Sequence, residues 1–132
     1  MASLKNSPAW QALDAHYRQT AGSHMRDLFS WDENRFERFS LNLGGLFLDS
    51  SKNRVTGETM DLLVELARAG DAEGWRDRMF AGDTINTTED RAALHVALRM
   101  PPGEDTAPLK VDGEDVLAVG RAMRKKMRAF SD

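Results

Sequence analysis

The stretch MFAGDTINTTEDRAALHVALR (residues 79–99) carries more information than any other part of this sequence. Residues 83–91 of this stretch are mainly polar, and the residues that follow place apolar side chains at helical spacing. Thr87 or Thr88 is suited to cap a helix whose first turn would hold Glu89 and Asp90, where the helix dipole favours negative charge. We therefore predict a helix through the second half of this stretch.

Composition and charge narrow the class of protein before any further motif is considered. The chain has 132 residues, 41% of them hydrophobic and 30% charged, which is ordinary for one globular domain. Its net charge of -3 gives no general attraction to nucleic acid or anionic lipid, and the lack of cysteine excludes disulfides and thiolate metal sites. No apolar run approaches the roughly 20 residues that span a bilayer, and residues 1–5 lack the apolar core of a secretory signal. We therefore expect a cytoplasmic protein with no nucleic-acid partner and no membrane partner.

Start and stop signals predict a mainly α-helical segment with a few short strands. Ser7 is suited to cap a first helix, with Pro8 at its first position and Gly22 at its end. Thr56 begins the clearest helix of the sequence, which ends at Gly70. We expect a short turn from Ser23 and further helices from Asp32, from Asp71 to Gly82 and over 116–130. We also expect a hairpin over 41–48 around Gly44-Gly45, a loop over 101–108, and a short strand at 109–111 before a turn at Asp112-Gly113. With no internal repeat and no obvious second domain, residues 1–132 are treated as a single structural unit.

Apolar residues at helical spacing predict which face of each helix is buried. The sets expected to face the interior are Trp10, Leu13 and Tyr17; Phe36 and Phe39; Met60, Leu63, Val64 and Ala67; Trp75 and Met79; and Val116, Val119, Met123, Met127 and Phe130.

The histidines do not form an evident site. His16, His24 and His95 fall in separate predicted elements, which does not match the short helical spacing of a zinc site. His95 lies between Leu94 and Val96, and we favour a half-buried, hydrogen-bonded role for it over proton transfer. We expect no metal and no other cofactor.

The charged residues also have structural explanations. The pairs Asp32-Glu33, Glu89-Asp90 and Glu114-Asp115 all stand at predicted helix starts, where capping and the helix dipole explain them. The loop over 82–88 is a weak candidate for anion binding, because its carboxylates would repel an anion. A basic cluster lies on the last helix, opposite the apolar stripe: Arg121, Arg124, Lys125, Lys126 and Arg128. We favour a packed helix with a solvated basic face over a membrane- or partner-binding helix, because the remainder of the chain is acidic.

The stretch 79–99 resembles the N-terminal signature of the glucose-6-phosphate isomerase family. The same family is matched, in the right order, by DLF (27–29), RFERFS (35–40), SKNRVT (51–56) and VDGEDV (111–116). Two local departures occur: residues 100–107 stand where the family usually has an Asn-Arg-Ser-Asn type segment, and Leu117-Ala118-Val119 replaces a Pro-Glu-Val step. The resemblance extends across nearly the whole chain.

This resemblance implies an enzyme that interconverts glucose 6-phosphate and fructose 6-phosphate in glycolysis and gluconeogenesis, through an enediol intermediate and without a cofactor. It implies an α/β architecture and a homodimer for the whole enzyme. The family's catalytic and phosphate-binding groups lie C-terminal to the matched region, so the resemblance assigns no catalytic and no substrate-binding residue to this sequence. Arg91 and His95 lie four residues apart on one predicted helix face. They are our candidates for residues that support the active site without contacting the substrate.

We therefore expect an N-terminal fragment of a glucose-6-phosphate isomerase that lacks the catalytic core segments and is inactive alone. Its expected partners are the remainder of the isomerase and the second subunit of the homodimer, and sugar phosphate would bind only to the full-length enzyme. One alternative is a stand-alone helical binding module that uses the basic C-terminal helix. Another is a split enzyme, in which a separately encoded remainder complements this chain.

Overall fold

The computed structural model describes residues 4–100 and 107–131. Their contacts gather into two compact units, one ending at Gly70 and one beginning at Asp71. Helices predominate in the described residues and the strands form short antiparallel pairs, which confirms the mainly helical prediction. None of the helices in this described part of the chain combines the length and apolar character that crossing a membrane requires. The expectation that residues 1–132 work as one structural unit stays a prediction.

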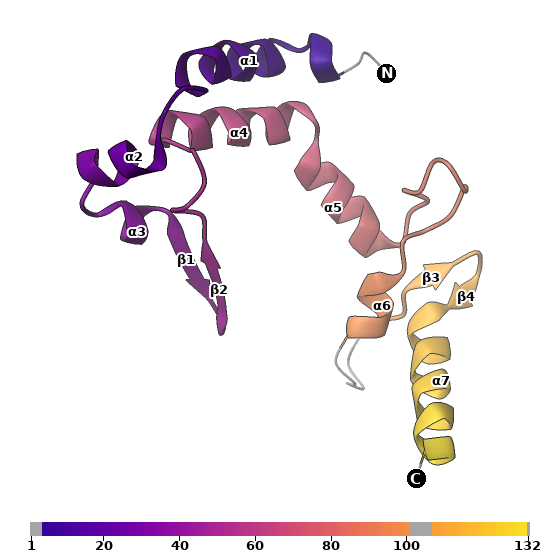
Figure 1. Ribbon diagram of the computed structural model, residues 1–132. Coiled ribbons are helices and arrows are strands. Elements are labelled where there is room, and N and C mark those ends of the chain that lie inside the picture. Colours follow the sequence, from indigo (N-terminus) through magenta and orange to yellow (C-terminus); the bar gives the residue numbers. More distant parts are fainter. Residues whose placement is uncertain (1–3, 101–106, 132) are drawn as a thin grey trace. The chain divides into compact units, whose positions relative to one another are not determined.

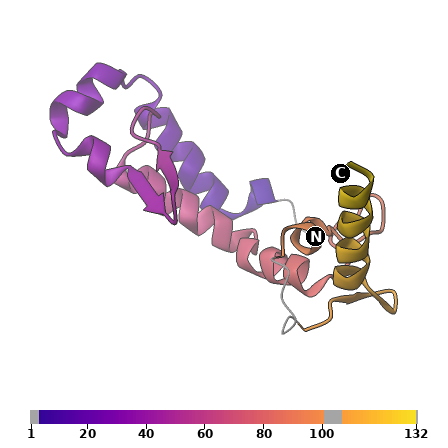
Figure 2. The same ribbon diagram turned by 90° about the horizontal axis from the view of Figure 1, so that it is seen from below.

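Two helices form the centre of the first unit. A short 3-10 helix, η1 (Leu4–Asn6), leads into α1 (Pro8–Thr20), which packs beside α4 (Gly57–Ala69; Figures 1 and 2). The Ser7 hydroxyl accepts a hydrogen bond from the amide of Trp10 (3.2 Å), as its predicted capping role requires. Helix α4 begins with a reciprocal capping box between Thr56 and Thr59, so its predicted start is also confirmed.

Two short helices and a hairpin complete this unit. Helix α2 (Met25–Trp31), capped by His24, forms where the sequence pattern predicts a short turn from Ser23. Helix α3 (Arg35–Arg38) begins after Asn34 rather than at Asp32. Strands β1 (Ser40–Leu43) and β2 (Leu46–Asp49) then form the predicted antiparallel hairpin.

The hairpin turns at Gly44 and Gly45, which have φ values of 54° and 86°. Glycine adopts this left-handed backbone without a steric penalty, so the two glycines determine where the chain reverses.

The second unit contains α5 (Ala72–Ala81), α6 (His95–Arg99), β3 (Lys110–Val111), β4 (Glu114–Asp115) and α7 (Val116–Ser131), with α6 packed against α7. The Asp115 carboxylate accepts from the amides of Leu117 (3.1 Å) and Ala118 (3.3 Å), so this acidic pair has its predicted capping role. Asp71 precedes α5 in a left-handed conformation, with φ 55°, and its side chain makes no cap hydrogen bond. Asp71 therefore marks the start of α5 without capping it.

The predicted helix through residues 87–99 is largely wrong. Residues 87–94 form turns and irregular backbone, and α6 begins only at His95 with Leu94 before it. Neither Thr87 nor Thr88 caps a helix. The loop expected over 101–108 falls mostly on residues 101–106, which lie outside the described residues.

The predicted buried faces are also only partly correct. Among the described residues the buried apolar side chains are Leu28, Phe39, Ala97 and Leu117, whereas most members of the expected sets are exposed. On α7 the buried positions are Leu117 and Gly120. The expected stripe is half-buried at Val116 and then runs from 45% exposed at Val119 to 93% at Phe130. The expected α4 stripe is exposed too, and Leu62 and Leu66 are the half-buried leucines of that helix.

Candidate functional site

The polar middle of the stretch 79–99 forms a turn over residues 86–91, here named the Asn86 turn. The amide of Asn86 donates to the carbonyl of Arg91 (3.0 Å), and the amide of Arg91 donates to the carbonyl of Asn86 (3.3 Å). The Asn86 side-chain oxygen accepts from the Thr88 hydroxyl (2.8 Å) and from the Glu89 amide (3.3 Å). One asparagine thus satisfies the polar groups of the turn, which is the ordinary way that Asn competes with helix formation.

Arg91 and His95 do not share a helix face, because only His95 belongs to α6. Nε of Arg91 donates to Glu89 Oε2 (3.0 Å), and its Nη2 pairs with the same oxygen, which also accepts from the side-chain amide of Asn86 (3.0 Å). His95 is exposed, and no hydrogen bond to its ring occurs within the described residues. Our expectation of a half-buried, hydrogen-bonded His95 is therefore wrong.

Arg91 and His95 nevertheless line one hollow of about 860 Å³ beside the Asn86 turn. Its lining also includes the carboxylates of Glu89, Asp90 and Asp112. Three carboxylates around one guanidinium that is already paired with Glu89 give this hollow no surplus of positive charge. The geometry therefore gives no support to phosphate binding by the described residues of this hollow.

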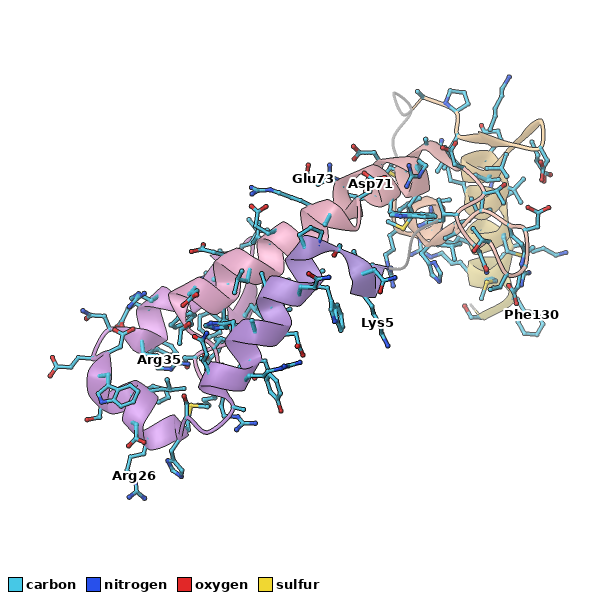
Figure 3. The ribbon with its side chains drawn as sticks, turned by 90° about the horizontal axis from the view of Figure 1, so that it is seen from above. Lys5, Arg26, Arg35, Asp71, Glu73 and Phe130 are labelled. Atoms are coloured by element: carbon cyan, nitrogen blue, oxygen red, sulfur yellow. The ribbon has the colours of Figure 1, made fainter. Side chains whose placement is uncertain are left out.

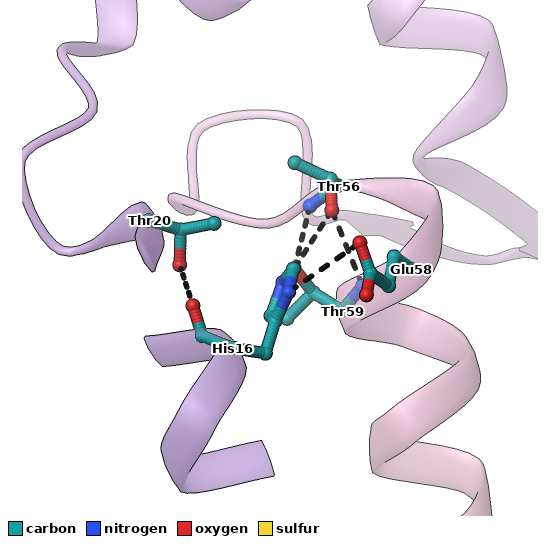
Figure 4. A network of polar contacts seen from close by, with 5 residues as sticks. All are labelled: His16, Thr20, Thr56, Glu58 and Thr59. Atoms are coloured by element: carbon teal, nitrogen blue, oxygen red, sulfur yellow. Dashed lines mark hydrogen bonds and ion pairs between the residues drawn. The ribbon is translucent and has the colours of Figure 1, made fainter. Parts of the chain in front are cut away.

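A second polar cluster joins α1 to α4 through His16, for which the sequence pattern indicated no role. The His16 side chain is 5% exposed; its Nε2 lies 2.7 Å from the Thr59 hydroxyl and its Nδ1 lies 3.5 Å from a Glu58 carboxylate oxygen (Figure 4). The Thr59 hydroxyl also accepts from the Thr56 amide (2.9 Å) in the capping box of α4. His16 therefore connects the packing of α1 directly to the first turn of α4.

The arrangement around His16 favours one tautomer. Nδ1 is buried and makes no hydrogen bond that meets ordinary geometry, and the group that faces it at 3.5 Å is the acceptor Glu58. A lone pair at Nδ1 would face a carboxylate, whereas an N–H would face it favourably. We therefore assign the proton of the neutral ring to Nδ1, with Nε2 accepting from the Thr59 hydroxyl.

His16 also borders a hollow of about 350 Å³ that contains both an acid and a cation, Asp14 and Arg54. Each of these three groups has a structural partner. Asp14 pairs with Arg18 one turn away, His16 contacts Thr59, and Arg54 donates to the carbonyl of Ala21 (2.8 Å). His16 and Arg54 thus join separate segments of the fold, whereas the Asp14–Arg18 pair lies on the surface of α1.

Arg35 organises the matched segment SKNRVT (51–56). Its side chain is only 2% exposed; Nε donates to the carbonyl of Ser51 (2.8 Å), and Nη2 donates to the carbonyls of Asn53 (2.8 Å) and Val55 (2.9 Å). The guanidinium also lies over the Phe39 ring, 4.7 Å from its centroid. Figure 3 shows Arg35 among the side chains of its unit, whereas Arg26 extends away from the ribbon. No ion pair joins Arg35 to a carboxylate of the described residues.

Asp49 and Ser51 hold the start of the same segment. The Asp49 carboxylate accepts from the Ser51 hydroxyl (2.6 Å) and from the Ser51 amide (2.8 Å). These two donors, first the hydroxyl and then the amide, hold the pKa of Asp49 below its ordinary value, with a smaller contribution from Lys52. Ser51 itself is fully buried.

The remaining predicted charges are surface features. Asp32 pairs with Arg38 instead of capping α3, so only one of the three acidic pairs stands as a helix cap. In the basic cluster of α7, Arg124 donates to the carbonyl of Leu98 in α6 (3.0 Å), which uses this cation within its own unit. No group of three or more histidines and carboxylates suited to a metal ion occurs among the described residues.

The comparison with protein families identifies the class to which this chain belongs. The family model of phosphoglucose isomerase matches residues 49–132, which is more than half of the chain and includes both the SKNRVT segment and the Asn86 turn. The chain is a member of the phosphoglucose isomerase family.

Individual relatives are similar over nearly the whole chain. A protein of Chlorobium luteolum named glucose-6-phosphate isomerase is 50% identical over 129 residues, 98% of this chain. Glucose-6-phosphate isomerase of Mycolicibacterium smegmatis is 47% identical over 131 residues, and glucose-6-phosphate isomerase 2 of Chromobacterium violaceum is 46% identical over 129 residues. The chain spans only 23% of the length of each of these relatives.

Proposed function

We propose that this chain is the N-terminal part of a glucose-6-phosphate isomerase, and that it braces the active site without supplying its catalytic groups. The observation that carries the proposal is the 46–50% identity to proteins of that name over at least 98% of the chain. The reaction of the whole enzyme would be the interconversion of glucose 6-phosphate and fructose 6-phosphate.

The geometry supports a bracing role in preference to a catalytic one. In the hollow beside α1, the acid, the histidine and the cation are each paired with another group of the chain. In the hollow beside the Asn86 turn, the guanidinium of Arg91 is paired with Glu89. Catalysis requires such groups to converge on a reacting atom, and neither hollow shows such a convergence, so we expect the 132-residue chain alone to have no turnover.

For the whole enzyme we propose the α/β architecture and the homodimer that the family resemblance implies, working in the cytoplasm. The remainder of the isomerase would be the direct partner of this chain, and sugar phosphate would bind only once that remainder is present. Helices and short strands of this chain would then support the catalytic segments from outside.

In the whole enzyme, we propose that Arg91 and His95 support the active site without contacting the substrate. They line the same hollow, and the Asn86 turn fixes the backbone of Arg91 through two hydrogen bonds. In the assembled enzyme, Arg91→Gln should lower kcat/KM by roughly three- to tenfold, because a displaced support misplaces the groups it holds. Arg76→Gln is the matched control, because Arg76 pairs only with its neighbour Asp77 on the surface.

The experiment that tests the proposal is a chimera. The 132 residues are fused to the C-terminal part of the Chlorobium luteolum relative that they do not cover, and the chimera and the chain alone are assayed for conversion of fructose 6-phosphate. We expect turnover by the chimera and none by the chain. Turnover by the chain alone, or a folded chimera without activity, would overturn the proposal.

A further inference from the structure

The β1–β2 hairpin has one face composed of four leucines. The register pairs Leu41 with Leu48 and Leu43 with Leu46, and paired residues of an antiparallel ladder point to the same side. These four residues, named here the leucine face, are between 58% and 72% exposed. The leucine face therefore lacks a covering layer in the described part of the chain.

The opposite face of the hairpin is different. There the Phe47 ring lies 6.0 Å from the ring of Phe36, although both side chains remain about half exposed. Just after β2, the Ser50 hydroxyl donates to the carbonyl of Phe39 (2.7 Å). The first unit thus contacts the hairpin through Phe36 and Phe39 and leaves the leucine face uncovered. Since a two-stranded hairpin is marginally stable unless another layer packs on it, this face is built to be covered.

We infer that the leucine face is the docking surface for the remaining polypeptide of the isomerase, the part of the relatives that this chain does not match. The inference rests on the proposed function. Its occupant follows from length, because the chain spans 23% of its relatives and about three quarters of their sequence has no counterpart here.

The size and charge of the surface favour this occupant over a second copy of the chain. Four leucines at this exposure offer on the order of 500 Å² of apolar surface, below the ~800 Å² per partner that a stable complex buries. Packing within one folded polypeptide requires no such minimum, because the association entropy is absent. The face also carries no charge that could select a separate protein partner.

The test compares the chain alone with the chimera described above by hydrogen exchange of residues 40–49 and by oxidative labelling of the leucine side chains. We expect strong protection of the leucine face in the chimera and little in the chain alone. A leucine face that stays unprotected in a folded chimera overturns the inference. A chain that self-associates through this face also overturns it, because the occupant would then be a second copy.

Substitutions provide the second readout. Leu43→Thr combined with Leu46→Thr keeps β-propensity while removing apolar contact, and Asn42→Thr on the opposite face is the matched control. In a two-piece experiment, in which the chain and the separate remainder are mixed, the double variant should weaken association at least about tenfold and the control should not. Equal affinities for the double variant and the control would overturn the inference.

The two proposals fail in different ways. Association that depends on the leucine face but restores no turnover contradicts the isomerase proposal and leaves the docking inference standing. Turnover that is indifferent to Leu43→Thr and Leu46→Thr contradicts the docking inference alone. If the double variant does not fold, the single variant Leu46→Thr is measured against the same control.

Discussion

Arg35 offers the sharpest test of how this fold is held together. We expect Arg35→Met to lower the free energy of unfolding by about 3 kcal/mol, because hydrogen bonds from a charged donor contribute ~1.5–3 kcal/mol each and part of that sum offsets the cost of burying the guanidinium. Three such bonds, to the carbonyls of Ser51, Asn53 and Val55, are lost together. Methionine fills a similar volume, so a cavity adds little.

Arg35→Lys separates charge from geometry. A lysine ammonium keeps the charge but lacks the planar fork that reaches carbonyls on both sides of the segment. We expect Arg35→Lys to lower the free energy of unfolding by about 2 kcal/mol, because one or two of the three hydrogen bonds to backbone carbonyls would lack a donor. Near-complete rescue by lysine would refute the argument from geometry.

Arg38→Met is the matched control for both variants. Arg38 lies over the same Phe39 ring at 5.6 Å, but it is exposed and pairs with Asp32 on the surface. Arg38→Met should lower the free energy of unfolding by at most about 1 kcal/mol, as is usual for the loss of a surface ion pair. Unfolding is followed by far-UV circular dichroism in urea, with hydrogen exchange at residues 51–56 as a local measure. Arg35→Met and Arg38→Met unfolding at the same urea concentration would refute the assignment of Arg35 as the organiser of this segment.

Three further predictions follow from single contacts. His16→Ala should destabilise the chain by about 2 kcal/mol in urea unfolding, because it removes the link from α1 to Thr59 and leaves a cavity; an effect below that of surface substitutions would contradict this link. The Asp49 carboxylate should stabilise the fold at pH values above the ordinary aspartate pKa, and this contribution should vanish as the pH falls through the lowered pKa of the folded state. Asp49→Asn should therefore flatten the dependence of the free energy of unfolding on pH below about pH 4. Identical pH profiles for the variant and the original chain would contradict this prediction. In the same assay, Gly82→Ala should lower the free energy of unfolding by about 2 kcal/mol and Gly113→Ala by about 1 kcal/mol. Both glycines have φ above 80°, but only a Cβ at position 82 would lie 3.0 Å from Val111. Equal losses for the two variants would contradict the close contact.

The sequence predicted those elements whose determinants are local. Ser7 and Thr56 cap their helices through neighbours three residues away, and Gly44-Gly45 reverses the chain within the hairpin itself. Each of these features depends on backbone preferences and hydrogen bonds within a few residues. A single sequence is therefore sufficient to place them.

The Asn86 turn shows where prediction from the local sequence pattern failed. Thr87 and Thr88 are acceptable cap residues, but the side chain of Asn86 accepts from Thr88 and Glu89 and so offers the backbone a competing arrangement. The signal was present as an asparagine followed by hydroxyl and acidic residues, which is typical of an Asx turn. It was outweighed by the helical spacing of the apolar residues that follow.

Arg35 and His16 could not have been singled out, because their partners are distant in sequence. Arg35 bonds carbonyls 16 to 20 residues away, and His16 contacts a hydroxyl 43 residues away. An arginine next to a phenylalanine and a lone histidine have many surface explanations. Only the packing of α1, α3 and α4 makes these side chains buried and indispensable.

The exposed apolar stripes of α4 and α7 lead to the same conclusion as the leucine face. Periodicity predicts burial whenever an apolar stripe is present, and it does not indicate what covers that stripe. Here the stripe of α7 remains uncovered while Leu117 and Gly120 on another side of the helix are buried. A helix that buries one side within its own unit and presents a second apolar side outward is typical of a middle layer between two others. These failed burial predictions are therefore best explained by the larger family member that the similarity indicates, in which the stripes would meet the part of the polypeptide not matched by this chain.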